Sequence, residues 1–211
     1  MWLTFLGRRI QLFRDKNSRS APRRRGQFNT LFGFERLEER QLLAADILYR
    51  VNAGGAALAG TPGWTADSSG SPSVYSNASA AQSKTTSVSN SINMTHASLP
   101  AGTPAAMFQT ERWDQSGGSE MQWNFAVTPG TYEVRLYFSE NYSGAQKIGG
   151  RVFDVMIEGQ TVLDNYDVYA DVGSYKGVMK SFVVTADSNI DIDFQRITQN
   201  PAVKGIEIIK A

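Results

Sequence analysis

Residues 121–138 read MQWNFAVTPGTYEVRLYF, which is two alternating segments around a turn. In 121–127 and again in 132–138, large apolar side chains occupy every second position and polar ones lie between them. A period of two is typical of a β-strand that buries one face of its sheet. The Pro129-Gly130 pair between the segments has the composition of a turn. The stretch therefore predicts two strands joined by a short connection.

The same strand composition recurs on both sides of this unit. Further strands are expected at Asp46–Asn52, Arg151–Ile157, Thr161–Leu163, Val178–Thr185, Ile190–Phe194 and Val203–Ile209. Short strands at intervals of about 8–15 residues are the pattern of an all-β, antiparallel sandwich. No segment keeps an apolar 3.6-residue period, so helix should be scarce. Residues 56–103 are nearly free of charge and rich in small polar residues, which predicts long loops.

Charge divides the 211-residue chain near residue 45. Residues 1–45 contain ten Lys/Arg and four Asp/Glu, a net charge of +6, whereas residues 46–211 contain eleven and sixteen, a net charge of −5. Such an asymmetry indicates two parts with different roles. There is no cysteine, which excludes disulfides and cysteine-bound zinc. The sequence predicts one folded domain at 46–211 behind a basic segment at 1–45.

The basic segment has no apolar run long enough for a secretory signal or a transmembrane helix. Residues 34–45 read FERLEERQLLAA, which resembles the LEPR-XLL type of N-terminal segment on large exported proteins of planctomycete bacteria. Glu39 stands where that pattern has proline. The resemblance implies an export segment, cleaved near Ala45. The alternatives are a disordered basic tail and a nucleic-acid-binding segment, although no aromatic platform is interleaved with the arginines.

Five strings in the folded part occur in the order of a known family. They are Val51–Gly55, Phe108–Trp113, Arg151–Val155, Val162–Tyr169 and Asn200-Pro201. Together they resemble the malectin family of carbohydrate-binding β-sandwiches, from about Tyr49 to Lys210. The resemblance implies a jelly-roll topology of the galactose-binding-domain-like type.

Sugar rings present flat C–H patches beside hydroxyl groups, so a sugar site needs exposed aromatic faces and fixed polar partners. The resemblance implies a carbohydrate-binding groove lined by Trp64, Tyr75 and Tyr142, with Gln199 and Asn200 as hydrogen-bonding partners. Ser143 replaces a second aromatic residue of the family, and Gln199 replaces an acidic one of malectin itself. The strand aromatics are expected in the core instead; they are Trp123, Phe125, Tyr132, Phe138, Phe153 and Phe182.

The resulting hypothesis is a non-catalytic module that binds glucose-type or related oligosaccharides, secreted or at the cell surface of a bacterium. It needs no cofactor, has no predicted metal ligands and binds no nucleic acid; a structural calcium elsewhere in the sandwich is left open. The first alternative is an adhesion or assembly module that binds protein. The second is a glycoside hydrolase using two of the carboxylates Glu111, Glu140 and Asp154. A fold-fixing ion pair is also expected between Glu111 and Arg112.

Other chemistries find little support in the sequence. His96 is the only histidine, and no nucleophile-elbow pattern accompanies it. The run from Asp187 to Asp191 imitates the start of a calcium loop. Ile192, however, stands where the sharp turn of that loop needs glycine, and Thr198 stands where it needs a glutamate.

Overall fold

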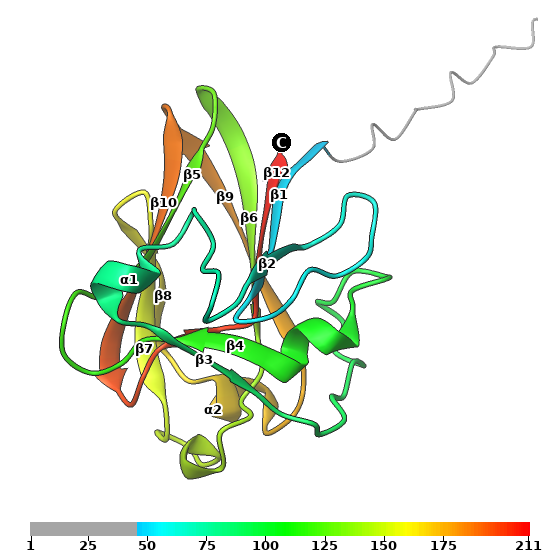
Figure 1. Ribbon diagram of the computed structural model, residues 1–211, viewed down its shortest axis with the longest axis vertical. Coiled ribbons are helices and arrows are strands. Elements are labelled where there is room, and N and C mark those ends of the chain that lie inside the picture. Colours follow the sequence, from blue (N-terminus) through cyan, green and yellow to red (C-terminus); the bar gives the residue numbers. More distant parts are fainter. Residues whose placement is uncertain (1–45) are drawn as a thin grey trace, which may run out of the picture. The chain divides into compact units, whose positions relative to one another are not determined.

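The computed structural model describes residues 46–211. The two alternating segments form β5 (Met121–Ala126) and β6 (Gly130–Phe138), and every second side chain of each is buried, as their period of two requires. They do not pair with each other. β5 lies in a four-stranded sheet and β6 in a five-stranded one, so the Pro129-Gly130 connection crosses from one sheet to the other. The two sheets face each other as a sandwich (Figure 1).

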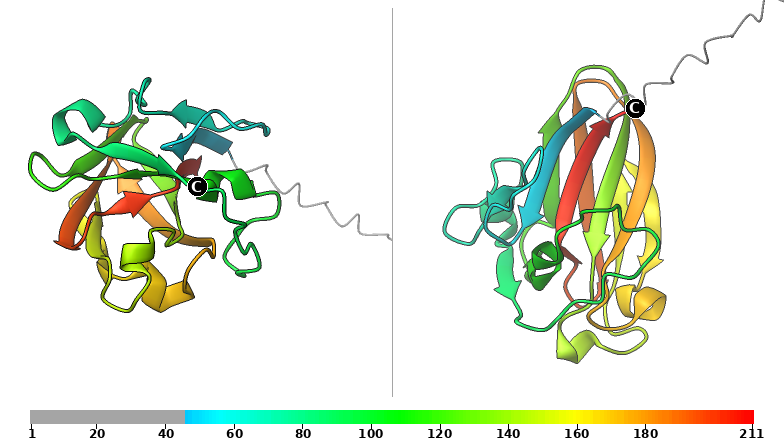
Figure 2. Two further views of the ribbon diagram at one scale, coloured as in Figure 1. Left: turned by 60° about the horizontal axis from the view of Figure 1, so that its bottom comes forward. Right: turned by 90° about the vertical axis from the view of Figure 1, so that its right-hand side faces the viewer.

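The five-stranded sheet has the order β2-β1-β12-β6-β9. Its remaining strands are β1 (Asp46–Ala53), β2 (Thr65–Asp67), β9 (Val178–Ala186) and β12 (Gly205–Lys210). All neighbours pair antiparallel except β1 and β2, which are parallel. The first and last strands, β1 and β12, lie side by side (right-hand view of Figure 2).

The four-stranded sheet has the order β5-β10-β7-β8 and is antiparallel throughout. It contains β7 (Val152–Ile157), β8 (Gln160–Tyr166) and β10 (Asn189–Thr198). A small third sheet of β3 (Lys84–Ser87), β4 (Thr110–Trp113) and β11 (Ala202–Val203) lies at one end of the sandwich (Figure 1). The helical elements are single turns: α1 (Ala78–Ala81), α2 (Val168–Val172), η1 (Ala105–Gln109) and η2 (Ser143–Ala145).

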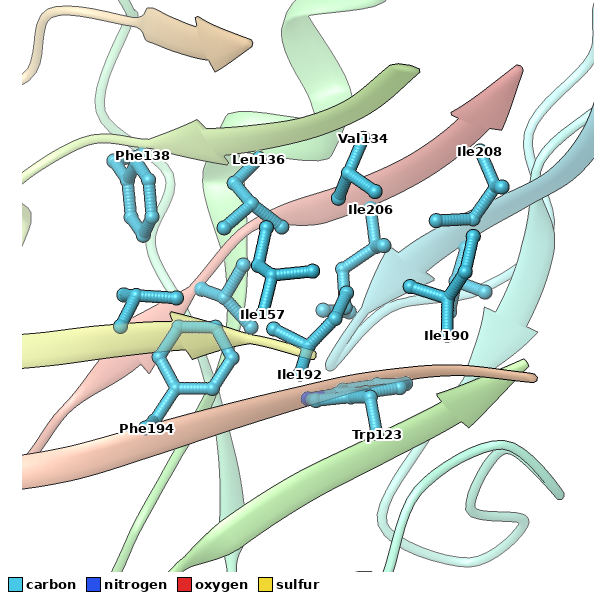
Figure 3. Close-up of a cluster of buried hydrophobic side chains, with 14 of the residues drawn as sticks. Trp123, Val134, Leu136, Phe138, Ile157, Ile190, Ile192, Phe194, Ile206 and Ile208 are labelled. Atoms are coloured by element: carbon cyan, nitrogen blue, oxygen red, sulfur yellow. The ribbon is translucent and has the colours of Figure 1, made fainter. Parts of the chain in front are cut away.

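The main core fills the space between the two sheets. In Figure 3, Val134, Leu136 and Phe138 from β6 face Ile192 and Phe194 from β10. Five of the six aromatic residues expected in the core are buried there, whereas Phe182 is half-buried and packs against the core edge. Because these side chains alternate with polar ones, each sheet turns its apolar face toward the core.

A second, smaller cluster covers part of the outer face of the five-stranded sheet. It consists of Trp64, Met107, Phe108 and Tyr137, with half-buried side chains from the 89–104 loop against it. Tyr137 points outward from β6, and the ring of Trp64 meets it edge-on at 5.4 Å between centroids. The long loops are therefore held to the sheet by an apolar cluster of their own.

The predicted all-β, antiparallel sandwich is confirmed, and helix is scarce as expected. The short strands β2, β3 and β4 lie in segments where no strand was predicted. No helix within residues 46–211 is long and apolar enough to cross a membrane. The predicted export segment and its cleavage near Ala45 fall outside the described residues.

Candidate functional site

The antiparallel pairing gathers several strand ends at one end of the sandwich. Phe138 at the end of β6 pairs with Val178 at the start of β9, and Thr198 at the end of β10 pairs with Val152 at the start of β7. A groove of about 420 Å³ opens there beside the third sheet. Its lining residues are Thr86, Val88, Gln109, Glu111, Trp113, Asn141, Tyr142, Ser143, Arg151, Tyr175, Gln199, Asn200 and Lys204.

Three aromatic side chains line this groove. Trp113 comes from the end of β4, Tyr142 from the loop after β6 and Tyr175 from the loop before β9. The indole N–H of Trp113 donates to Thr86 Oγ1 at 2.8 Å, which fixes the ring on the third sheet. Tyr142 is the most open of the three, with 50% of its surface exposed. Such rings offer apolar faces next to polar tips.

Both tyrosines are positioned by Glu140. The carboxylate of Glu140 accepts the backbone N–H of Tyr142 at 2.9 Å, and its backbone carbonyl accepts that of Tyr175 at 3.1 Å. Tyr175 has a positive φ of 50°, a conformation that costs energy for a bulky residue. A third bond, from the N–H of Asn93 to the carbonyl of Tyr175 at 2.8 Å, helps to hold it there.

The floor of the groove consists of buried charges in pairs. Lys204 Nζ lies 2.5 Å from Glu111 Oε2, and Arg151 Nε lies 2.7 Å from Glu140 Oε2. Burial tends to raise the pKa of Glu111, but the charges of Lys204 and Arg151 outweigh it and hold that pKa below its usual value. Glu111 is therefore ionised at neutral pH, and each basic side chain of the floor lies against a carboxylate.

The turn at Gln199 and Asn200 forms one wall. Gln199 has a φ of 61°, and its side-chain oxygen accepts the backbone N–H of Asn200 at 3.1 Å. The carbonyl of Asn200 accepts from Arg151, and its side-chain oxygen accepts from Arg196. Within residues 46–211 the side-chain NH₂ groups of Gln199 and Asn200 have no protein acceptor, so both are donors available to a ligand.

The structure brings together three of the five residues predicted for the site. Tyr142, Gln199 and Asn200 line the groove, but Trp64 and Tyr75 do not. Trp64 is 4% exposed, because the apolar cluster on the outer face of the five-stranded sheet takes up its ring. Tyr75 stacks on Phe125 at 5.0 Å between centroids and lines a separate, shallow depression over β5 and β10. The prediction that all three aromatics line one groove is therefore wrong.

The expected ion pair between Glu111 and Arg112 is also wrong. Neighbouring residues of a strand point to opposite faces, so their side chains are directed apart. Glu111 pairs with Lys204 below the groove, whereas Arg112 makes two bonds to Asp67, at 2.6 and 2.7 Å, on the other side of β4.

The candidate catalytic carboxylates have structural partners. Glu140 is 1% exposed and bound by Arg151, Glu111 is bound by Lys204, and Asp154 Oδ1 accepts the backbone N–H of Asn165. Residues 187–191, which imitate the start of a calcium loop in sequence, form the turn into β10 and the start of that strand. No group of three or more His, Cys, Asp or Glu side chains within residues 46–211 is placed to hold a metal ion.

Sequence reasoning missed Trp113 and Tyr175 in the groove and Lys204 and Arg151 in its floor. Trp113 belongs to one of the family strings, and a tryptophan at the end of a short polar strand is a signal that could have been used. The two cations gave no local signal, since their partners lie 93 and 11 residues away in the chain.

Comparison with known proteins agrees with this architecture. Residues 47–209 match the family model described as the malectin domain. A receptor-like protein kinase of Arabidopsis thaliana is 30% identical over 122 residues, which is 51% of this chain and 14% of that protein. The chain thus spans only a small part of this relative.

Solved structures with the same fold include two plant receptor ectodomains. The plant receptor-like kinase FER and the ANX2 ectodomain from Arabidopsis thaliana each match with a TM-score of 0.64 and 22% identity. Each match covers 78% of this chain and 49% of the other. FER is also solved in complex with the plant peptide RALF23 and LLG2. A β-glucuronidase of Bacteroides uniformis matches with a TM-score of 0.57 and 20% identity, over 77% of this chain and 18% of the enzyme.

Proposed function

Since the chain belongs to the malectin domain family, we propose that it is an extracellular carbohydrate-binding module and that the groove beside the third sheet is its binding site. The observation that carries this proposal is the joint placement of Trp113, Tyr142 and Tyr175 around free amide donors. Apolar ring faces next to fixed polar groups fit the alternating C–H and hydroxyl surface of a sugar. The ligand class is a glucose-type or related oligosaccharide.

The paired charges of the floor favour a neutral ligand. Lys204 and Arg151 each have an anionic partner within 2.7 Å, so neither offers an uncompensated charge to a uronic acid or a sulfate. The same pairing disfavours catalysis, because a carboxylate held ionised by a buried cation is a poor general acid. We propose that the module is non-catalytic.

The affinity should be modest. Aromatic faces worth ~1 kcal/mol each and a few net hydrogen bonds of about 1 kcal/mol give roughly 4–6 kcal/mol. This corresponds to a dissociation constant of about a millimolar to tens of micromolar. Tight binding would need several copies of the module to act together.

A glycan array followed by titration calorimetry tests the proposal. Tyr142→Ala is expected to weaken binding about fivefold or more, which is the loss of about one aromatic face. Ser143→Phe restores a second ring beside Tyr142 and is expected to tighten binding to glucose disaccharides. Tyr169→Ala is the matched control, since Tyr169 lies in α2 outside the groove. If Tyr142→Ala binds every array ligand as the parent does, the groove is not the sugar site.

A protein-binding role is the second candidate, favoured by Ile148. This side chain is 81% exposed in the loop that also carries the half-exposed Tyr142. Large apolar side chains that are exposed on one loop are a feature of protein interfaces. Ile148→Ser should leave sugar binding unchanged and abolish capture of a protein partner. Loss of sugar binding in Ile148→Ser would instead place Ile148 in the sugar site.

We also propose that residues 1–45 are the export segment of a bacterial secreted or cell-surface protein. The support is the net positive charge of this segment and its resemblance to LEPR-XLL segments. Mass spectrometry of the mature protein should find an N-terminus near Ala45. Cytosolic protein that retains its arginine-rich segment would contradict this assignment.

A further inference from the structure

Strand β9 forms one edge of the five-stranded sheet, beside β6 (right-hand view of Figure 2). It is nine residues long and pairs with β6 along its whole length without a register shift. Lys180 is its one charged residue. An edge strand that is long, regular and poor in charge is a template for pairing with another strand.

The outward backbone groups of β9 are free along most of the edge. In an antiparallel pair, alternate residues direct their N–H and C=O groups toward the neighbouring strand and away from it. The N–H of Met179 is directed away from β6, because it donates to Ser98 Oγ at 2.9 Å. Ser181, Val183 and Thr185 are therefore directed outward too. Within residues 46–211 their backbone N–H and C=O groups have no hydrogen-bond partner.

The other sheet edges within residues 46–211 are protected. The strands β2, β3 and β11 have three, four and two residues. Residues 73–77 cover β5, where the N–H of Asn124 donates to the carbonyl of Tyr75 at 2.7 Å. Strand β8 departs from regular pairing at two register shifts and carries Asp164. Shortness, cover, bulges and charges are ways to block an edge. In this part of the chain, β9 has none of them along residues 181–185.

Apolar side chains lie on both faces of the free edge. On the outer face, Val183 is 71% exposed. On the inner face, Phe182 and Val184 are half-buried and pack against the rim of the main core. A strand added beside β9 would remove apolar surface from water on both faces, which stabilises the contact.

We propose that the edge of β9 binds the same edge of a second copy of this chain. The two strands run antiparallel about a two-fold axis at Val183, so that the five-stranded sheets of both copies become one continuous sheet. This inference goes beyond the proposed sugar site and does not depend on it. A strand from another protein is the competing occupant.

The free backbone groups select this register. Val183 lies opposite the partner's Val183, and Ser181 lies opposite the partner's Thr185. Each of these residues then donates its free N–H across the axis and accepts at its carbonyl. A shift of the axis to Phe182 would place Thr185 opposite the partner's Met179, whose N–H is already bound to Ser98. A shift to Val184 would place Ser181 opposite a residue beyond the end of the strand.

The side chains agree with the same register. On the inner face, Phe182 lies opposite the partner's Val184. These two form a non-hydrogen-bonded pair, in which the Cα atoms are about 4.5 Å apart and the side chains are in contact. The apolar rim of one core thus continues into that of the other copy.

The charges also fit a second copy. Lys180 lies opposite the partner's Ala186, which is followed by Asp187. The lysines of the two copies are six residues apart along the pair, a distance of about 20 Å. The cation of β9 therefore has an acidic neighbour across the interface and does not meet its own copy.

The two grooves of such a dimer lie at opposite ends of the joined sheet. The groove lies at the end of the sandwich where β9 begins, at Val178, and the two β9 strands run in opposite directions. If the groove binds sugar as proposed, the dimer links two glycan chains and gains avidity only where both are presented.

Analytical ultracentrifugation of the full chain tests the proposal without a ligand. Between micromolar and millimolar protein, the sedimentation coefficient of the parent should rise toward that of a dimer. Val183→Lys places two cations opposite each other at the axis and should stay monomeric throughout. Val74→Lys is the matched control, because Val74 is 90% exposed on the loop beside β5. It should associate as the parent does.

Two results of this experiment would overturn the proposal. A parent that is monomeric at every concentration has no such interface. A Val183→Lys protein that associates as the parent does has its interface elsewhere. Because Val183 is exposed, the melting temperature of Val183→Lys in dilute solution should equal that of the parent, which separates loss of association from loss of the fold.

Single cysteines test the register, since the chain contains none. Val183→Cys places two cysteines opposite each other with Cα atoms about 5.5 Å apart, within reach of a disulfide. In Thr185→Cys the two cysteines are four residues apart along the pair, about 13 Å, which is too far. Mild oxidation of concentrated protein should convert Val183→Cys to a covalent dimer and leave Thr185→Cys mostly monomeric. Equal cross-linking of both variants would contradict the register.

Amide hydrogen exchange distinguishes a second copy from other occupants. The N–H groups of Phe182 and Val184 point to β6 and should exchange slowly at every protein concentration. Those of Ser181, Val183 and Thr185 should exchange fast in dilute protein and slowly in concentrated protein. Slow exchange of these three in a dilute monomer would show that another segment of the same chain covers the edge, and would overturn the proposal.

Discussion

Gly54 explains, at the scale of one residue, why two family strings that are far apart in the sequence are in contact in the fold. A Cβ atom at this position would lie 2.0 Å from the carbonyl oxygen of Glu111 in β4. Gly54 also has a φ of 78°, which favours glycine. The glycine string after β1 and the string that contains β4 are thus two sides of one close backbone contact. Because β4 carries Trp113 and Glu111, this contact helps to place the groove.

Gly54→Ala is therefore expected to destabilise the protein strongly. The positive φ alone costs roughly 1–2 kcal/mol for a residue with a Cβ, and the contact with Glu111 adds to it. Gly149→Ala is the matched control, since Gly149 has a φ of 72° but no heavy atom within 4 Å of its Cβ position. Urea denaturation should show a much larger loss for Gly54→Ala. Equal losses would mean that the backbone contact is unimportant.

Lys204 gives a second prediction at the same scale. Lys204→Met leaves Glu111 buried without its partner and should cost about 3–5 kcal/mol of unfolding free energy. Changing Glu111 to Gln as well removes the unpaired charge and should recover much of this loss. The control is Lys180→Met, whose partner Asp171 is 30% exposed, with an expected change of about 0–1 kcal/mol. Urea denaturation compares all three, and a double variant as unstable as Lys204→Met would contradict the pairing.

At the scale of elements, the outer-face cluster explains how long loops of small polar residues are held in place. The 57–64 and 89–104 segments add half-buried Leu58, Ile92, Met94 and Leu99 to the four buried members of the cluster. The charge of Arg50 also lies 5.3 Å from the ring centroid of Trp64. The loops thus gain apolar burial that their composition alone did not indicate.

Trp64→Ala should therefore act on stability and not on sugar recognition. Loss of a buried tryptophan is expected to cost about 3–5 kcal/mol. Val74→Ala is the control, because Val74 is 90% exposed and should lose almost nothing. Thermal unfolding and calorimetry with the same glycan separate the two effects. If Trp64→Ala keeps the melting temperature of the parent but loses glycan binding, Trp64 contacts the ligand and the prediction is wrong.

At the scale of the whole molecule, carboxyl groups with lowered pKa values and one with a raised pKa change the free energy of unfolding in opposite directions as pH changes. The pKa of Glu133 is lowered by its bonds to Arg135, and the charges around Glu111 lower its pKa despite burial. Their contribution is complete above the unfolded value of 4.5 and is lost as pH falls through the lower folded pKa. Asp114, whose pKa burial raises to about 6, contributes in the opposite sense, and this contribution is lost as pH rises through 6.

The urea midpoint should accordingly be highest near pH 5, lower at pH 3 and slightly lower at pH 7.5. Asp114→Asn should remove the decline between pH 5 and 7.5 and keep the loss in acid. Denaturation curves at the three values check this. A midpoint that rises steadily from pH 3 to pH 7.5 in the parent would show that the pKa of Asp114 is not raised.

The sequence by itself determined most of the longer strands and the class of fold. Side-chain alternation is a local property of the chain, so the strand expected at Val178–Thr185 is found at Val178–Ala186, and β1 and β7 agree as closely. The strand expected at Val203–Ile209 is divided between β11 and β12, which lie in different sheets. The family resemblance also indicated Tyr142, Gln199 and Asn200, which meet in the groove. These residues lie at the ends of long, strongly patterned strands, where the position along the chain fixes the position in the sheet.

Only the tertiary structure decided which sheet each strand joins and which loop aromatics reach the groove. β5 and β6 are neighbours in sequence but belong to opposite sheets, and Trp64 is buried while Tyr175 is not. The physical reason is that these outcomes depend on contacts between distant residues, such as Glu111 with Lys204, 93 positions apart. An aromatic ring or a charge in a loop has the same local pattern whether it packs on a sheet or faces a ligand. Its role is set by what the fold places against it.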